Sequence, residues 1–134
     1  MNLKVLIVDD DEVVIFIQKK LMANSEVSEN PLVFKRASSA LDFLQSENNN
    51  KEFLILLDIN MPGMNGWEFL DELNKEVDKD RYYVIMVTSS VEQKDKERAF
   101  RYTMVKDFLE KPITRECCQK IKDIPEISHF FEKI

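Results

Sequence analysis

Short apolar runs alternate along this chain with segments in which apolar residues recur at helical spacing. Residues 3–8 are almost continuously apolar, which is typical of a strand buried on both faces of a sheet. Val13, Ile17 and Leu21 then recur every four positions, with polar residues between them. This spacing predicts a helix over about residues 11–23 whose apolar side, formed by these three residues, faces a core.

The alternation continues to the end of the chain. Further strands are predicted where apolar or β-branched residues cluster, at residues 32–35, 53–57, 82–87 and 108–109. The polar run at residues 46–50 is expected to be a surface loop that separates the second helix from the third strand.

Helices are predicted between these strands and after the last one. The second helix is expected to have Ser38 or Ser39 as its cap, because a serine hydroxyl accepts hydrogen bonds from the free N–H groups of a helix start. The third begins at Gly66 and carries an apolar face that ends with Val77. The fourth, over residues 91–102, is mostly charged and is expected to cover little of the core.

The last helix is expected to run from a cap at Thr114 to about Lys122, before Pro125. Strands that alternate with helices in this way favour an α/β fold, with a parallel sheet and helices on both faces. Open sheets of this kind bind ligands beyond the carboxyl ends of their strands. The residues that directly follow the strands are therefore the candidates for function.

Charged and hydroxyl side chains stand at these strand ends. The first strand is followed by Asp9 and Asp10, the third ends in Asp58, the fourth ends in Thr88, and Lys111 follows the fifth. Carboxylates that are packed together repel one another, so that either one is protonated or a cation lies between them. Hard oxygen ligands of this kind suit Mg²⁺. Beside Mg²⁺ a carboxylate can act as a nucleophile toward phosphorus, with the ammonium and the hydroxyl stabilising the phosphoryl oxygens.

Composition and charge narrow the possible functions. The chain has 134 residues, which suits one domain, and its net charge of −6 argues against nucleic acid as a direct partner. No apolar run approaches the ~20 residues of a membrane-spanning helix. Cys117 and Cys118 are adjacent and are the two cysteines of the chain, so a disulfide framework is not expected and a reducing cytoplasm is the expected location.

Four motifs stand at the strand ends in a fixed order: Val8-Asp9-Asp10-Asp11-Glu12, Leu57-Asp58-Ile59-Asn60-Met61-Pro62-Gly63-Met64-Asn65-Gly66, Val87-Thr88-Ser89 and Lys111-Pro112. In their order and separations, the chain to about residue 122 resembles the receiver domain of bacterial two-component response regulators, of the stand-alone, chemotaxis-receiver-like kind. The resemblance implies a flavodoxin-like, doubly wound sheet with strand order 2-1-3-4-5.

The resemblance also implies a role for each acidic site residue. Asp58 would be the phosphoacceptor. Mg²⁺ would be held directly by Asp10 and Asp58, by Asp9 mainly through water, and by the main-chain carbonyl of Asn60. Asp11 is instead expected to favour the start of the first helix through the helix dipole.

The remaining family positions concern the phosphoryl group and the switch. Thr88 and Lys111 would hold the phosphoryl group, and the peptide bond between Lys111 and Pro112 would be cis. Phe108 stands at the family's aromatic switch position, where phosphorylation would draw Thr88 inward and the ring would turn in to fill the vacated space.

The resemblance implies a signalling protein rather than an enzyme. Its phosphodonor would be a histidine kinase or a phosphotransfer protein, and its output would be phosphorylation-dependent binding of an unidentified protein. Residues 1–122 would form the receiver domain. Residues 123–134 would form an extension whose apolar Ile127, Phe130, Phe131 and Ile134 pack on the domain or on a partner.

Three alternatives share some of these features. A haloacid-dehalogenase-type Mg²⁺-dependent phosphatase places an Asp-x-Asp pair after its first strand, whereas this chain has Asp9 followed directly by Asp10. A flavodoxin-like flavin carrier needs a phosphate-binding loop at that place, where Asp9, Asp10 and Asp11 would repel a phosphate. The third alternative, a receiver-like adaptor that is never phosphorylated, would not need the complete set of site residues.

Overall fold

Five parallel strands form the centre of the computed structural model, which describes residues 3–47 and 51–132. The strands lie in the order β2-β1-β3-β4-β5, so the predicted α/β fold and its strand order are confirmed. The elements, in chain order, are β1 (Leu3–Val8), α1 (Glu12–Asn24), β2 (Leu32–Phe34), α2 (Ala37–Ser46), β3 (Glu52–Asp58), α3 (Gly66–Asn74), the 3-10 helix η1 (Lys79–Arg81), β4 (Tyr82–Thr88), α4 (Gln93–Ala99), β5 (Val105–Glu110), α5 (Arg115–Lys122) and the 3-10 helix η2 (Ser128–Phe131).

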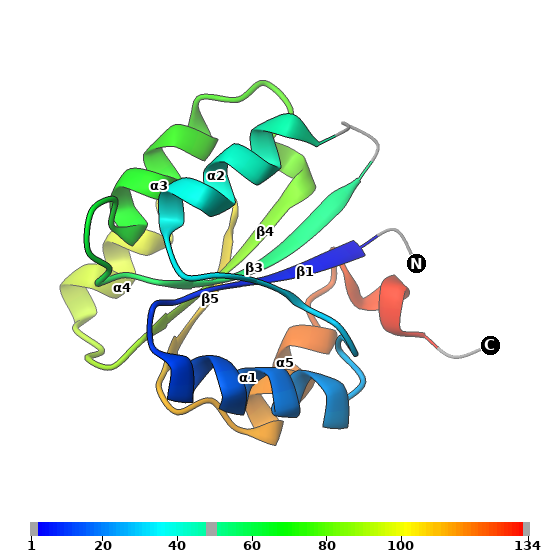
Figure 1. The fold of residues 1–134 in the computed structure, drawn as a ribbon. Helices are drawn as coiled ribbons and strands as arrows, with labels where there is room; N and C mark the ends of the chain where they lie inside the picture. Colours follow the sequence, from blue (N-terminus) through cyan, green and yellow to red (C-terminus); the bar gives the residue numbers. More distant parts are fainter. Residues whose placement is uncertain (1–2, 48–50, 133–134) are drawn as a thin grey trace.

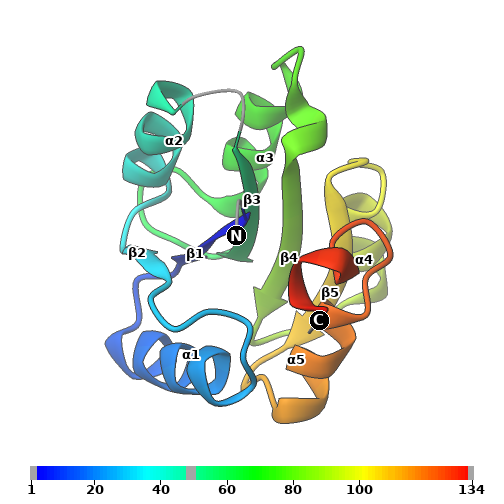
Figure 2. The same ribbon diagram turned by 90° about the vertical axis from the view of Figure 1, so that its right-hand side faces the viewer.

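Helices cover both faces of the sheet, with α1 and α5 on one face and α2, α3 and α4 on the other (Figures 1 and 2). Each face has its own apolar core, because successive side chains of a strand point to opposite faces. In β3, Leu54 and Leu56 enter the core beside α1 and α5, whereas Phe53, Ile55 and Leu57 enter the core beside α2 and α3. Within the described residues, no helix combines the length and the apolar character needed to span a membrane.

The register of the strands brings their carboxyl ends to one edge. Val8 of β1 pairs with Leu57 of β3, and Asp58 pairs with Val87 of β4. Because β1 and β3 are parallel and Val8 pairs with Leu57, the next residues of the two strands, Asp9 and Asp58, lie side by side. The chain order of the strands thus determines which side chains converge.

The predicted buried face of α1 is wrong in two of its three residues, since only Leu21 packs, partly buried, against the core. Val13 is 67% exposed and Ile17 is 38% exposed, whereas Ile15, Gln18 and Met22 are buried against the sheet. The helix carries apolar residues on more than one side, so recurrence every four positions does not by itself identify the inner side. The path of the chain from β1 into the helix sets the rotation and turns a different stripe inward.

The predicted serine cap of α2 is also wrong. The helix begins at Ala37, and Arg36 occupies the cap position without a side-chain hydrogen bond. Ser38 and Ser39 lie in the first turn and are exposed. Burial of Ala37 explains the early start, because the helix must already be formed there to place this methyl group in the core.

Two helices are shorter than predicted. α3 ends at Asn74, so Val77 does not belong to its apolar face and its side chain is fully exposed. The chain instead turns into η1, which places Arg81 inside the protein before β4. α4 covers residues 93–99 rather than 91–102, and its one buried residue is Ala99, in agreement with the prediction that it covers little core.

The C-terminal extension packs on the domain over the part that the structure describes. Ile124 and Ile127 are buried in the core beside α1 and α5, and Phe130 and Phe131 lie partly buried against it. Ile134, which the sequence places on the same apolar side, lies outside the described residues.

Candidate functional site

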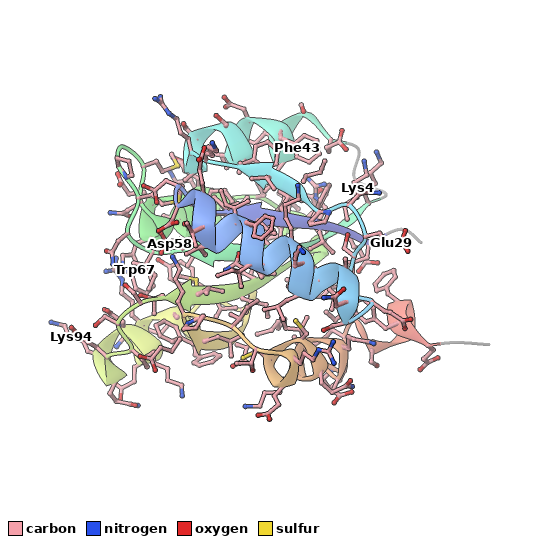
Figure 3. The ribbon with its side chains drawn as sticks, turned by 60° about the horizontal axis from the view of Figure 1, so that its bottom comes forward. Lys4, Glu29, Phe43, Asp58, Trp67 and Lys94 are labelled. Carbon is pink, nitrogen blue, oxygen red and sulfur yellow. The ribbon has the colours of Figure 1, made fainter. Side chains whose placement is uncertain are left out.

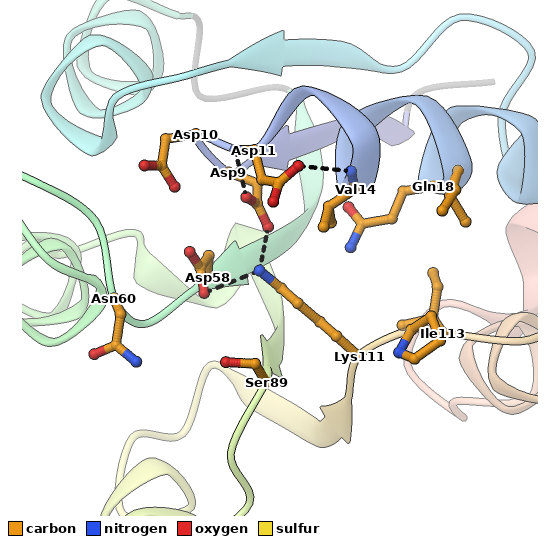
Figure 4. Close-up of a pocket in the computed structure, with 12 residues that line it drawn as sticks. Asp9, Asp10, Asp11, Val14, Gln18, Asp58, Asn60, Ser89, Lys111 and Ile113 are labelled. Atoms are coloured by element: carbon orange, nitrogen blue, oxygen red, sulfur yellow. Dashed lines mark hydrogen bonds and ion pairs between the residues drawn. The ribbon is translucent and has the colours of Figure 1, made fainter.

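A cavity of about 420 Å³ opens at the carboxyl edge of the sheet, between α1 and the segment that follows β5 (Figure 4). Its wall is acidic on one side and mostly apolar on the other. It is lined by Asp9, Asp10, Asp11, Val14, Ile17, Gln18, Asp58, Asn60, Ser89, Lys111, Pro112 and Ile113.

Lys111 lies at the centre of this site. Its Nζ is 2.7 Å from Oδ2 of Asp9 and 3.3 Å from Oδ1 of Asp58, so one ammonium bridges the ends of two neighbouring strands (Figure 4). The backbone N–H of Lys111 donates to the carbonyl of Thr88 at 2.8 Å, which holds the backbone of Lys111 beside the end of β4. The bond between Lys111 and Pro112 is cis, as the family resemblance predicts.

Local hydrogen bonds hold the loop between β1 and α1. Asp9 donates its backbone N–H to the carbonyl of Phe34 at 3.1 Å, and its Oδ1 accepts from the backbone N–H of Asp11 at 2.9 Å. Asp11 in turn caps α1, since its carboxylate accepts from the backbone N–H groups of Val13 and Val14. The third acid of the run is therefore used by the helix start, and Asp9 and Asp10 remain for the site.

The site carries more negative than positive charge, which favours the binding of a cation. Asp58 is only 6% exposed, and burial together with the charge of Asp9 raises the pKa of its carboxyl, although Lys111 and the backbone N–H of Asn60 act to lower it. Burial acts to lower the pKa of Lys111, but its contacts with the carboxylates of Asp9 and Asp58 outweigh this and raise it. The lysine is thus held as a cation, yet one positive charge does not balance the acids around it.

Three carboxylates lie close enough together to ligate one divalent ion. One oxygen each from Asp9, Asp10 and Asp58 lies within 4.8 Å of the others, with Asp9 and Asp58 buried and Asp10 exposed. Hard carboxylate oxygens with one side open to solvent suit Mg²⁺, which retains several waters. The residues therefore fit the metal. Asn60 lines the same cavity, and the role of its main-chain carbonyl as a ligand stays a prediction.

The side chains of Thr88 and Phe108 are both buried in this structure. The Thr88 side chain is buried, and its hydroxyl is engaged with the backbone of Ser90, from whose N–H it accepts at 3.3 Å and to whose carbonyl it donates at 3.4 Å. Ser89, rather than Thr88, lines the cavity. The ring of Phe108 is buried in the same core cluster as Ala99 of α4, and the turn of this ring on phosphorylation stays a prediction.

Gln18 is a site residue that the sequence analysis missed. It is one of the polar residues between the apolar positions of α1, but it is only 2% exposed and lines the cavity (Figure 4). Its Oε1 has no hydrogen-bond partner among the residues that the structure describes. No signal in the sequence marks it, because its burial follows from the rotation of the helix.

Comparison with known proteins gives this arrangement a class. Residues 5–122 match the response regulator receiver domain family, and the chain belongs to that family of two-component signalling proteins. It is 30% identical over 117 residues to Protein PilH of Pseudomonas aeruginosa, which covers 87% of this chain and 92% of PilH. It is 28% identical over 95 residues to Response regulator Rcp1 of Synechocystis sp., covering 68% of this chain and 65% of Rcp1.

Solved structures share the fold over almost the whole chain. A response regulator receiver protein from Dyadobacter fermentans superimposes with a TM-score of 0.81 at 26% identity and covers 98% of this chain and 99% of that one. A two component response regulator from Cytophaga hutchinsonii gives a TM-score of 0.82 at 24% identity and covers 95% of this chain and 97% of that one. The predicted family and fold are thus confirmed.

Proposed function

We propose that this receiver domain accepts a phosphoryl group on Asp58 from the phosphohistidine of a histidine kinase or a phosphotransfer protein, with Mg²⁺, and then signals by binding a downstream protein. One observation carries the proposal: the buried carboxylate of Asp58 has Lys111 at 3.3 Å and carboxylate oxygens of Asp9 and Asp10 within 4.8 Å. We place this activity in the cytoplasm, where the free thiols of Cys117 and Cys118 would stay reduced.

The acids of the site would hold the metal. Asp9, Asp10 and Asp58, with the main-chain carbonyl of Asn60, are the proposed ligand set for Mg²⁺. When bound, Mg²⁺ would supply positive charge to the phosphoryl oxygens and to the crowded carboxylates.

The protein's own groups perform the transfer. A carboxylate oxygen of Asp58 attacks the phosphorus, an O–P bond forms, and the P–N bond to the donor imidazole breaks. The bonding electron pair stays on the ring nitrogen, which takes a proton from solvent. Lys111, already 3.3 Å from Oδ1 of Asp58, then donates to a phosphoryl oxygen. Such transfer depends mainly on position and on neutralisation of charge.

The hydroxyl of Thr88 can contact the phosphoryl group only if it gives up its hydrogen bonds to Ser90. Its hydroxyl bonds to Ser90 are 3.3 and 3.4 Å long, at the weak end of the hydrogen-bond range. A phosphoryl oxygen is a stronger, charged acceptor. We therefore expect the Thr88 hydroxyl to leave Ser90 and donate to the phosphoryl group, which changes the packing between β4 and β5.

A phosphorylation assay with matched variants tests the proposal. The protein is incubated with acetyl phosphate and Mg²⁺, and its intact mass is measured. We expect one phosphoryl group on the wild type, none on Asp58→Asn, and strongly reduced Mg²⁺-dependent labelling of Asp10→Asn. Asp11→Asn is the control, because asparagine also caps helices and the change removes the same charge from the same loop. Labelling of Asp58→Asn at the wild-type level would overturn the proposal.

A further inference from the structure

The cavity at the carboxyl edge of the sheet has two chemically different ends (Figure 4). Carboxylates line one end, and the phosphoryl chemistry proposed above takes place there. The other end lies between α1 and the segment after β5, and its wall is apolar. Val14, Ile17, Pro112 and Ile113 form this wall, and we call this part of the cavity the apolar end.

Gln18 lines the apolar end, away from the acceptor. Asp58 lies beside the start of α1, whereas Gln18 follows Glu12, the first residue of the helix, by six positions, which is about 9 Å along the helix axis (Figure 3). In Figure 4 the amide of Gln18 points from α1 into the cavity, on the same side as Val14 and Ile113. The side chain therefore belongs to the part of the cavity that the proposed phosphoryl transfer leaves unused.

The amide oxygen of Gln18 lacks a hydrogen-bond donor. The residue is only 2% exposed, and its Oε1 has no partner among the residues that the structure describes. A buried acceptor without a donor costs free energy that an apolar side chain at the same place would avoid. Because native proteins satisfy the great majority of such atoms, we expect a donor from outside the chain.

The wall of the cavity does not supply that donor. Lys111 is the one cationic side chain of the lining, and Asp9 and Asp58 hold its ammonium at 2.7 and 3.3 Å. The side chains of Asn60 and Ser89 lie toward Asp58 in Figure 4. Water is a poor substitute at the apolar end, because an ordered buried water needs about two to four polar partners. An apolar molecule with one donor would satisfy Oε1 and also bury the apolar wall.

We propose that the apolar end binds a small, neutral aromatic molecule with one N–H donor, of the kind and size of indole. The ring would lie between α1 and the segment after β5, and its N–H would donate to Oε1 of Gln18. A cavity of roughly 150 Å³ holds benzene, so the cavity of about 420 Å³ found here has room for a two-ring molecule beside the acids. The nearby carboxylates disfavour an anion, and the apolar wall disfavours any charge. The inference does not depend on phosphorylation of Asp58.

Indole and 1-methylindole are the matched probes, because they share the ring system and only indole can donate a hydrogen bond. Each is titrated into the full chain without Mg²⁺, and backbone amide chemical shifts are recorded. We expect saturable shifts at residues 14–18 and at Ile113 with indole. A neutral hydrogen bond shifts an equilibrium by about 2- to 12-fold, and 1-methylindole should bind more weakly by that factor. Shifts that do not saturate, or that miss both segments, would overturn the proposal.

Gln18→Met separates the hydrogen bond from the fit of the ring. Methionine keeps the length of the side chain and removes the amide, so this variant should bind the two probes with equal affinity and be at least as stable to urea as the wild type. Gln45→Met is the control, because Gln45 is an exposed glutamine of α2 and its replacement should preserve the wild-type ratio of affinities. A wild-type ratio in Gln18→Met would mean that shape alone excludes the methyl group, and the proposal would be wrong.

Added Mg²⁺ tests whether the two ends of the cavity are separate. The acids that would hold the ion line the other end, so saturating Mg²⁺ should change the affinity for indole by less than about 2-fold. Displacement of indole by Mg²⁺ would place the molecule among the acids and overturn its assignment to Gln18.

Discussion

Replacement of Lys111 by methionine tests how the charges of the site are balanced. The ammonium lies 2.7 Å from Asp9 and 3.3 Å from Asp58, and both carboxylates are buried. Methionine keeps most of the length and apolar stem of lysine but removes the charge. Lys111→Met therefore leaves two buried acids without their shared partner.

The expected cost follows from these distances. At an effective dielectric constant of about 20, unit charges at the two separations attract by roughly 6 and 5 kcal/mol. Desolvation of the lysine, which methionine avoids, offsets much of that attraction, and removal of one partner from a buried ion pair costs about 3–5 kcal/mol. Because the Lys111 side chain is 14% exposed, we expect the lower end, about 3 kcal/mol at pH 7 without Mg²⁺.

Urea denaturation of a double-mutant cycle with Asp9→Asn measures this cost. We expect Lys111→Met to be destabilised by about 3 kcal/mol and the double variant to recover about 1–2 kcal/mol of it, because one unpaired charge is gone. Added Mg²⁺ should restore part of the remaining loss. A change below about 0.5 kcal/mol in Lys111→Met, with additive effects in the double variant, would refute this account of the site.

Three further predictions concern the acceptor, its loop and the extension. Asp58→Asn should unfold at a higher urea concentration than the wild type at pH 7. The pKa of Asp58 is raised in the folded state, so stability is lost as pH rises through that pKa, and the difference should fade toward pH 3.8, the ordinary pKa of this carboxyl. Gly66→Ala should cost about 1–3 kcal/mol, measured by the same method, because its Cβ would lie 2.9 Å from the Cα of Ile59. Ile127→Ala should cost about 2–5 kcal/mol, because this side chain is fully buried, and a loss below 1 kcal/mol would mean that the extension does not pack as described.

The strand-end residues could be predicted because few physical rules place them. Apolar runs identify the strands, alternation with helices makes the sheet parallel, and parallel strands present their carboxyl ends at one edge. Asp9, Asp58 and Lys111 then converge whatever the details of the helices. The strand order came from the family resemblance, and the structure confirms it.

Helix rotation and helix ends could not be predicted in the same way. The inner stripe of α1 depends on how the chain leaves β1, so the apolar spacing selects Val13 whereas the helix turns Gln18 inward. The start of α2 depends on the burial of Ala37, which outweighs the capping preference of the nearby serines. In both helices, tertiary packing overrides a local preference.

Contacts between distant segments left no local signal. Arg98 and Trp67 belong to different helices, and neither position shows in sequence that a guanidinium will stack on the ring. Arg81 is similar: the sequence shows a charged residue before a strand, but the structure buries it in ion pairs with Glu76 and Asp78. Such pairs depend on the packed fold.

The central claim is that the acyl phosphate forms on Asp58. Borohydride reduces an aspartyl phosphate to homoserine, which marks the modified position after proteolysis and peptide mass analysis. After incubation with acetyl phosphate and Mg²⁺, we expect homoserine at position 58 and unmodified acids at positions 9 and 10. Homoserine at position 9 or 10, or a phosphoryl group in the intact mass with no homoserine at position 58, would contradict it.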